Sequence, residues 1–388
     1  MVPEPRAGHD ESVTRDADVS RGVMAGDGYY DRHSATQQGA AAIRLDLLRA
    51  AISEADLNAA PTLRVADLGC AQGQNSLAPM AVVVDAIRQR SAADIDIVHT
   101  DLPGNDWTSL FEVIEHDPGS YLVGHEADVH PPVDGRSFYE DLFVRATLTA
   151  AWTSSSLHWL GASPGAVADD FFAQSSTDHA AIERYRAQAA ADWTDFLVRR
   201  CVELAPSASV VFVNVLMGDD GTMGPEALFD TLEQSLRAAR SAGTVTAEEY
   251  AAMTYPAWFR TQGELRAPFS PVLAGPGGEG RGGEELELVA LEPTILADPF
   301  LSAWEGPGDA ATYGRQQAGF LRGFPRTKLR NCVDGAWGRA AHRHPQPGLH
   351  RRRAPNCCGP ALRVARVQTG RRPNSPNRLT PTSVPGFG

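Results

Sequence analysis

The sequence predicts an α/β protein built on a doubly wound, mostly parallel β-sheet. Short apolar segments typical of strands alternate with amphipathic segments typical of helices along most of the chain. One segment, SVVFVNVLMG at 209–218, is apolar almost throughout, as expected of a strand buried on both faces. The chain has 388 residues, of which 43% are apolar and 21% charged. That length and composition suit one large globular domain or two small ones.

The first predicted unit is a strand, a glycine turn and a helix. Residues 63–68 form an apolar run that ends at Gly69, and a second glycine follows at Gly73. In the next segment apolar residues recur at steps of three and four, so we expect a helix with Asn75 or Ser76 as its N-cap.

The later elements continue this alternation. Their apolar patterns have the lengths and periods of strands and helices, and the longest helix carries one continuous apolar stripe. We expect strands at 95–99, 148–160 (with its turn), 209–218 and 286–293, an amphipathic helix at 178–206, interrupted helices over 219–280 and a mobile loop at 274–285.

Two acids stand where the first two strands end, Asp67 and Asp101. Ligands of open α/β sheets bind beyond the carboxyl ends of the strands, and an acid at the second position can accept both hydroxyls of a ribose. The loop from Gly69 to Gly73 lacks the Gly-x-Gly-x-x-Gly spacing, and no basic residue is near to meet a pyrophosphate. Asp67 instead suits a cationic ligand that carries an amino group. These features favour S-adenosylmethionine over a nicotinamide cofactor, and a purely structural glycine turn is the alternative.

Four segments together resemble the SABATH family, the salicylate, benzoate and theobromine methyltransferases. The DLPGND-type and SLHWL-type stretches are rare strings, so the joint match is specific. It covers residues 24–324 in order, and the chain is similar to a bacterial-type member. The segments are MAGDGYYDRHSATQQ at 24–38, ADLGCAQGQNSL at 66–77 with DLPGNDWTSLF at 101–111, RSFYEDLF at 136–143 and SSSLHWL at 154–160.

This resemblance implies a class I methyltransferase fold, a Rossmann-like sheet with a helical cap, and S-adenosylmethionine as cofactor. Dimers are common in the family, so a homodimer is a possible assembly, and the sequence itself does not determine the oligomeric state. The residues that match the family's cofactor positions are Tyr30, Ser34, Asp67, Gly69, Asn75, Asp101, Leu102, Ser137 and Phe138. The residues that match its acceptor site are Gln37, Ser155, His158 and Trp159, of which Gln37 and Trp159 hold the acceptor carboxylate through side-chain N–H groups.

The implied reaction is SN2 transfer of a methyl group to the carboxylate of a small aromatic or secondary-metabolite acid. A carboxylic acid is already ionised at neutral pH, so no strong general base is needed and no catalytic residue is assigned. The protein would supply alignment of the reacting atoms and exclusion of water. Two alternatives stay open, namely N-methylation of a heterocycle and a cofactor-binding relic without activity.

The chain departs from the family at several positions. Ala25 stands where the family usually has Lys, Ser155 stands where it has Tyr, and two residues are missing before Tyr30. We therefore expect a remodelled acceptor pocket that is enlarged at Ser155. Some family members are associated with magnesium, but the pair Asp169-Asp170 is too generic to carry this over, and we predict no metal site.

Charge and composition exclude several other classes of function. Residues 325–388 carry 12 Arg and one Lys against one acid, and the rest of the chain has a net charge of −25. A body that acidic repels phosphates, so nucleic acid is not an expected partner. No apolar run is long enough to span a membrane, and residues 1–23 lack the apolar core of a signal peptide. We expect a cytoplasmic protein with a disordered leader at 1–23.

The segment after residue 324 differs in character from the rest. It holds nine prolines and three of the five cysteines, with little apolar periodicity. It is either a basic arm for anionic ligands or nucleic acid, or the frame-shifted end of a GC-rich gene, which we favour. We expect residues 325–388 to be disordered and the sheet to lack the last strand that the family has. The predicted core then spans 24–218, and the cap with a late core strand spans 219–324.

Overall fold

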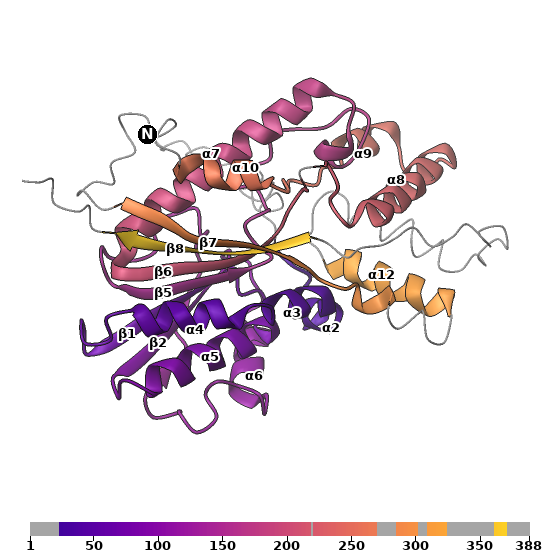
Figure 1. Ribbon diagram of the computed structural model, residues 1–388. Helices are drawn as coiled ribbons and strands as arrows, with labels where there is room; N and C mark the ends of the chain where they lie inside the picture. Colours follow the sequence, from indigo (N-terminus) through magenta and orange to yellow (C-terminus); the bar gives the residue numbers. More distant parts are fainter. Residues whose placement is uncertain (1–22, 219, 270–284, 302–308, 324–360, 371–388) are drawn as a thin grey trace, which may run out of the picture.

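The fold is a twisted β-sheet with helices packed on both faces (Figure 1). The computed structural model describes residues 23–218, 220–269, 285–301, 309–323 and 361–370. Three predicted segments lie almost wholly outside these residues. They are the leader at 1–23, the loop at 274–285 and the tail after residue 324 except for 361–370. Within the described ranges, no helix has the length and apolar character needed to cross a bilayer.

Eight strands form one sheet in the order β3-β2-β1-β5-β6-β8-β7, and β4 also pairs with β2. The ladders from β3 to β6 are parallel, whereas β8 is antiparallel to both β6 and β7. The predicted mostly parallel α/β sheet is therefore confirmed. The strands are Thr62–Leu68 (β1), Asp94–Thr100 (β2), Val129–His130 (β3), Val133–Asp134 (β4), Leu148–Ser154 (β5), Leu204–Val215 (β6), Glu285–Ile295 (β7) and Ala361–Gly370 (β8).

The helices fall into an N-terminal group, a group that flanks the sheet, and a cap (Figure 1). The long helix expected at 178–206 is confirmed as α7. The helices are Tyr29–His33 (α2), Ala35–Ala41 (α3), Leu45–Glu54 (α4), Leu77–Arg88 (α5), Trp107–His116 (α6), His179–Glu203 (α7), Glu226–Ser241 (α8), Ala247–Ala252 (α9), Gln262–Arg266 (α10) and Ala310–Gly323 (α12), with short 3-10 turns at Gln74–Ser76, Ala173–Ser175 and Ala267–Phe269.

Alternating side chains of β1 supply two separate cores. Leu63 and Val65 pack in the cluster formed with α4 and α5, whereas Ala66 and Leu68 pack in the cluster formed with α7. This division follows from the strand itself, because successive side chains point to opposite faces of a sheet. Burial on both faces explains why the sequence of these strands is apolar rather than alternating.

The pairing of β1 with β2 brings their ends to one level of the sheet. Asp67 lies opposite His99, and Leu68 lies opposite Thr100. The loops that follow the two strands therefore start side by side, and the backbone N–H of Gly69 donates to the oxygen of Thr100 at 2.8 Å. Two acids that are distant in sequence thus lie at the same edge, as expected.

The cap consists of α8 to α10 and the segment between them, and it is built around aromatic side chains. Phe171 and Phe172 from the segment before α7 pack against Phe229, Tyr255 and Phe259 from the cap. Several of these rings meet edge to face, and the centroids of Phe172 and Phe229 are 4.9 Å apart. The predicted interrupted helices after residue 218 are confirmed over the part of that segment which the structure describes.

The expectation that the sheet lacks its last strand is wrong. Residues 361–370 form β8 between β6 and β7, with Val364 opposite Val213 and Val367 opposite Val210. The high Arg and Pro content of the tail concealed a ten-residue segment, ALRVARVQTG, that contains no proline and carries Val364, Val367 and Thr369, residues common in strands. The rest of the tail lies outside the described residues.

A buried ion pair on α7 fixes the connection between β4 and β5. Nε of Arg200 lies 2.8 Å from Oε2 of Glu203, and their side chains are 0% and 2% exposed. Arg200 also donates to the carbonyl oxygens of Phe138 at 3.0 Å and Glu140 at 2.9 Å. Glu203 accepts the backbone N–H of Leu142 at 2.7 Å. The pair thus satisfies backbone groups that would otherwise be buried without partners.

Replacing Glu203 with glutamine is expected to lower the free energy of unfolding by about 3 kcal/mol or more, because it leaves a buried guanidinium without its counter-charge. Glu183 provides a matched control, since it forms an exposed pair with Arg186 at the same spacing on the same helix. Glu183→Gln should cost less than about 1 kcal/mol. Urea unfolding of both variants tests this, and equal losses would contradict it.

Candidate functional site

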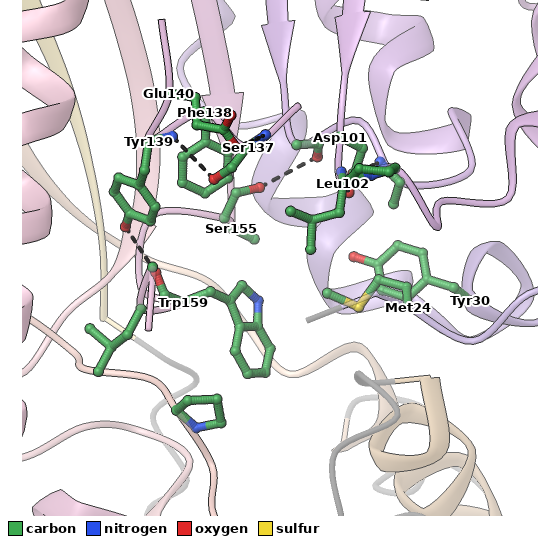
Figure 2. A pocket seen from close by; sticks show the side chains of 17 residues that line it. Met24, Tyr30, Asp101, Leu102, Ser137, Phe138, Tyr139, Glu140, Ser155 and Trp159 are labelled. Atoms are coloured by element: carbon green, nitrogen blue, oxygen red, sulfur yellow. Dashed lines mark hydrogen bonds between the residues drawn. The ribbon is translucent and has the colours of Figure 1, made fainter. Parts of the chain in front are cut away.

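A cavity of about 220 Å³ opens at the carboxyl ends of β1, β2 and β5. Figure 2 shows Met24 and Tyr30 on one side of it and the indole of Trp159 on the other. Asp101 and Leu102 lie above Tyr30 in this view. The walls therefore come from the N-terminal segment, the loops after the first two strands and the turn after β5.

The carboxylate of Asp101 is held by two backbone amides. Ala71 N–H donates to Oδ2 at 2.8 Å, and Leu102 N–H donates to Oδ1 at 2.7 Å. Burial raises the pKa of Asp101 to about 6, although these two hydrogen bonds oppose the rise. Each oxygen keeps a lone pair for a further donor, so the group is suited to a ligand with two adjacent hydroxyls.

The glycine loop needs glycine for steric reasons. Gly69 and Gly73 have φ of 81° and 96°, which lie in the left-handed region. A Cβ on Gly69 would stand 2.5 Å from Oγ of Ser156, so the turn could not pass the β5 loop with a larger residue. Asn105 Nδ2 donates to the oxygen of Ala71 at 2.7 Å and fixes the loop from the other side. The glycines therefore allow the backbone to line the cavity.

Asp67 lies behind the loop rather than among the cavity walls. Its Oδ2 lies 2.8 Å from Nδ1 of His99 and also accepts the hydroxyl of Ser76 at 2.5 Å. Nε2 of His99 in turn lies 2.7 Å from the hydroxyl of Tyr121. The sequence predicted Asp67 but gave no sign of this buried cluster. Ser76 occupies the N-cap position of α5, as one of two expected caps, but its hydroxyl bonds Asp67 instead of the helix.

The N-terminal helices bring several predicted cofactor residues to the loop. Ser34 is buried, and Asn75 Nδ2 donates to its Oγ at 3.4 Å. Oδ1 of Asn75 is buried without a hydrogen-bond partner in the described structure. Tyr30 lines the cavity itself, and its burial raises its pKa. A buried acceptor without a partner beside the loop fits a ligand donor at that place.

The loop is electrostatically negative. Burial raises the pKa of Cys70, and the nearby charges of Asp101, Asp67 and Asp31 raise it further. No lysine or arginine is among the described residues that line the cavity. A cationic ligand is thus favoured over a phosphate. Cys70 is buried, as expected of a small structural residue in the loop.

The turn after β5 supplies the opposite wall. Ser155 adopts a left-handed φ of 55° and donates its N–H to the oxygen of Val213 at 2.8 Å. The indole of Trp159 packs against the ring of Tyr255, with centroids 4.9 Å apart. Tyr139 donates its hydroxyl to the oxygen of Trp159 at 2.8 Å and so fixes the turn (Figure 2).

The predicted site residues are only partly gathered in the cavity. The ones that line it are Tyr30, Gly69, Asp101, Leu102, Ser137, Phe138, Ser155 and Trp159. The other five are not among the residues that line it: Ser34, Gln37, Asp67, Asn75 and His158. Thus the expectation that His158 faces the pocket is not met.

His158 lies behind Trp159 because it packs toward β6. Its Nδ1 is 3.4 Å from Oδ1 of Asn214, and its ring meets that of Phe259 edge to face. Burial lowers its pKa to about 4, so it is neutral at ordinary pH. Gln37 is also buried, and its Oε1 has no hydrogen-bond partner in the described part of the chain.

Sequence reasoning missed further lining residues, among them Met24, Tyr139 and Pro256. Met24 and Tyr139 belong to the family-like segments at 24–38 and 136–143. Their position in these segments was the only sequence feature that could have indicated a role in the site. Pro256 comes from the cap, where no pattern indicated a site. Among the described residues, no group of three or more His, Cys, Asp or Glu side chains could hold a metal ion.

Comparisons with known proteins identify the family. A family model described as SAM dependent carboxyl methyltransferase matches residues 20–269. Gibberellic acid methyltransferase 2 of Arabidopsis thaliana is 26% identical over 238 residues, which are 53% of this chain and 58% of that protein. The salicylate/benzoate carboxyl methyltransferase of Arabidopsis thaliana is 27% identical over 158 residues, 38% of this chain and 42% of that protein. The chain thus spans less than two thirds of the length of these relatives.

Among solved structures, a loganic acid methyltransferase with SAH is similar with a TM-score of 0.64 at 16% sequence identity. The match covers 91% of this chain and 99% of that chain, which confirms the predicted Rossmann-like fold. The family match runs from the N-terminal motif through the glycine loop to the cap, and it therefore includes every residue that lines the cavity. This chain belongs to the SAM dependent carboxyl methyltransferase family.

Proposed function

We propose that this protein transfers a methyl group from S-adenosylmethionine to the carboxylate of a small aromatic or secondary-metabolite acid. The observation that carries the proposal is Asp101, a carboxylate fixed by two backbone amides at the mouth of a cavity whose other wall is an indole. Its cytoplasmic setting and a homodimeric state are part of the proposal and rest on the sequence alone.

The donor end of the cavity fits the parts of this cofactor. Asp101 would accept the ribose hydroxyls, and Leu102 and Phe138 would flank the adenine. The carboxylates around the glycine loop suit the sulfonium and ammonium groups, since no basic side chain among the described lining residues competes for them. Ser34 and Asn75 would complete the amino-acid end of the site. When bound, the cofactor supplies an electrophilic methyl group on a cationic sulfur.

The acceptor end would orient the carboxylate through neutral donors. The indole N–H of Trp159 and the amide of Gln37 can hold an anion without a salt bridge, which would reduce its nucleophilicity. The acceptor carboxylate arrives ionised, so the protein need not remove a proton. What its residues contribute is alignment of the oxygen with the methyl group and exclusion of water.

The lowered pKa of His158 and its position outside the cavity lining favour a carboxylate over a heterocyclic nitrogen as the acceptor. An N–H nucleophile must lose a proton during transfer, and a base with a pKa near the working pH serves best. With its pKa lowered to about 4, His158 is a weak base, and it lies outside the cavity. The N-methyltransferase alternative therefore has less support from the residues present.

A panel of small aromatic acids and N-heterocycles, incubated with methyl-labelled S-adenosylmethionine, tests the activity. We expect label in methyl esters that mild base hydrolyses. Label in base-stable N-methyl products would instead support the heterocycle alternative. Binding of the cofactor without transfer to any compound of the panel would support an inactive relic.

Asp101→Asn is expected to weaken adenosylhomocysteine binding by about tenfold or more, because a charged acceptor of ribose hydroxyls is lost. In the wild-type protein the affinity should fall as the pH drops through about 6, where Asp101 becomes protonated and no longer accepts two donors. Calorimetry across this pH range checks both points. If the variant keeps the same pH dependence as the wild type, Asp101 is not its source.

Trp159→Phe should raise KM for the acceptor by about tenfold, since it removes one N–H donor to a charged group and keeps an aromatic ring. The affinity for adenosylhomocysteine should stay unchanged. Trp258→Phe is the matched control, because it also removes an indole hydrogen bond, to Glu264 at 3.2 Å, but outside the cavity lining. A similar rise of KM in both variants would argue against a direct role for Trp159.

A further inference from the structure

A buried row of polar side chains runs from the glycine loop into the protein. The hydroxyl of Tyr121 lies 2.7 Å from Nε2 of His99, and Nδ1 of His99 lies 2.8 Å from Oδ2 of Asp67. His99 is 0% exposed, and Tyr121 is 3% exposed. His99 comes from β2 and Asp67 from β1, where the two are register partners. The family resemblance assigned a role to Asp67 but none to His99 or Tyr121.

The protons of this row can be assigned from its chemistry. An ionised carboxylate only accepts hydrogen bonds, so the His99–Asp67 contact needs a proton on Nδ1. Burial and the charge of Asp67 raise the pKa of Tyr121, which keeps its phenol protonated. With the hydrogen of His99 on Nδ1, its Nε2 accepts the Tyr121 hydroxyl. Each hydrogen bond of the row then joins one donor to one acceptor.

We propose that His99 is a positioning residue for the cofactor's amino group, acting through Asp67. This inference rests on the proposed function, in which the carboxylates around the glycine loop suit the cationic groups of S-adenosylmethionine, and it takes Asp67, behind that loop, as the one that meets the ammonium group. His99 and Ser76 both bond Oδ2 of Asp67, and no hydrogen bond among the described residues reaches Oδ1. The row thus orients the carboxylate so that Oδ1 is left for the ammonium group.

The same contacts hold the carboxylate of Asp67 in place inside the protein. The Asp67 side chain is 5% exposed, so water does little to stabilise its charge. Two hydrogen bonds on one oxygen supply part of that stabilisation and fix the rotation of the group. Tyr121 in turn fixes the tautomer of His99, as a second partner of an imidazole commonly does.

A pair of isosteric variants separates this role from simple core packing. An asparagine amide nitrogen can reach the position of Nδ1, whereas a glutamine amide nitrogen reaches that of Nε2. His99→Asn should therefore keep the affinity for adenosylhomocysteine within a few fold, and His99→Gln should lower it by about tenfold or more. Both variants lose the imidazole, so thermal melting serves to compare their damage to the fold.

A second ligand makes the test specific for the amino group. 5′-Methylthioadenosine carries the nucleoside but lacks the ammonium and carboxylate of adenosylhomocysteine. We expect His99→Gln to leave its affinity within a few fold of wild type. Equal loss for both ligands, or equal loss in His99→Asn and His99→Gln, would overturn the proposal and leave His99 a structural core residue.

Asp67→Asn distinguishes this inference from the proposed function on which it rests. If that variant binds adenosylhomocysteine as tightly as wild type, Asp67 does not hold the cofactor and the role of His99 fails, whereas the donor site at Asp101 is tested separately by Asp101→Asn. If Asp67→Asn loses affinity but His99→Gln does not, the donor site stands and the positioning role of His99 is wrong. We expect both variants to lose affinity for adenosylhomocysteine.

Discussion

The site depends on one short connection, in which the carboxylate of Asp101 joins the loop after β1 to the loop after β2. Its two oxygens accept the N–H groups of Ala71 and Leu102. Together with the hydrogen bonds of Gly69 N–H to Thr100 and of Asn105 Nδ2 to Ala71, this bridge fixes the glycine loop against the end of β2. Burial still raises the pKa of Asp101 to about 6, so the carboxylate is under-solvated. Further donors from a bound ligand would offset that deficit, so the contact that fixes the loops is also consistent with the proposed binding role of Asp101.

The cavity has two ends of different character, and this division follows from the elements that form them. The loops after β1 and β2 bring carboxylates and exposed backbone together, because polar groups gather at the ends of parallel strands. The turn after β5 and the cap bring aromatic rings, with Trp159 packed on Tyr255. The cavity thus lies between a polar wall and an aromatic wall, which is consistent with the proposed transfer from a cationic donor to an acid.

Buried arginine side chains fix the segments that form the walls of the cavity. The Arg200–Glu203 pair fixes the segment before β5 through backbone carbonyls and amides. Arg260 is almost fully buried and donates to the oxygens of Leu157 and Ala189, which ties the turn after β5 to α7. Most of the backbone groups that these charged side chains bond lie in irregular segments, where no helix or strand ladder can satisfy them, and Ala189 of α7 is the exception among those named here.

The sequence alone determined the features that neighbours along the chain decide. The apolar runs of the strands, the glycine turn after Leu68, the acid at the end of β2 and the aromatic turn after β5 were all readable, because each depends on local patterns. Tertiary structure decided the rest. Asp67, His99 and Tyr121 form a row only because β1 and β2 pair in one register, and the contacts span 32 and 22 residues. His158 lies outside the cavity lining, because its ring packs toward Asn214 of β6. The segment 361–370 is a strand that pairs with β6 and β7, partners so distant in sequence that its own short pattern did not indicate them.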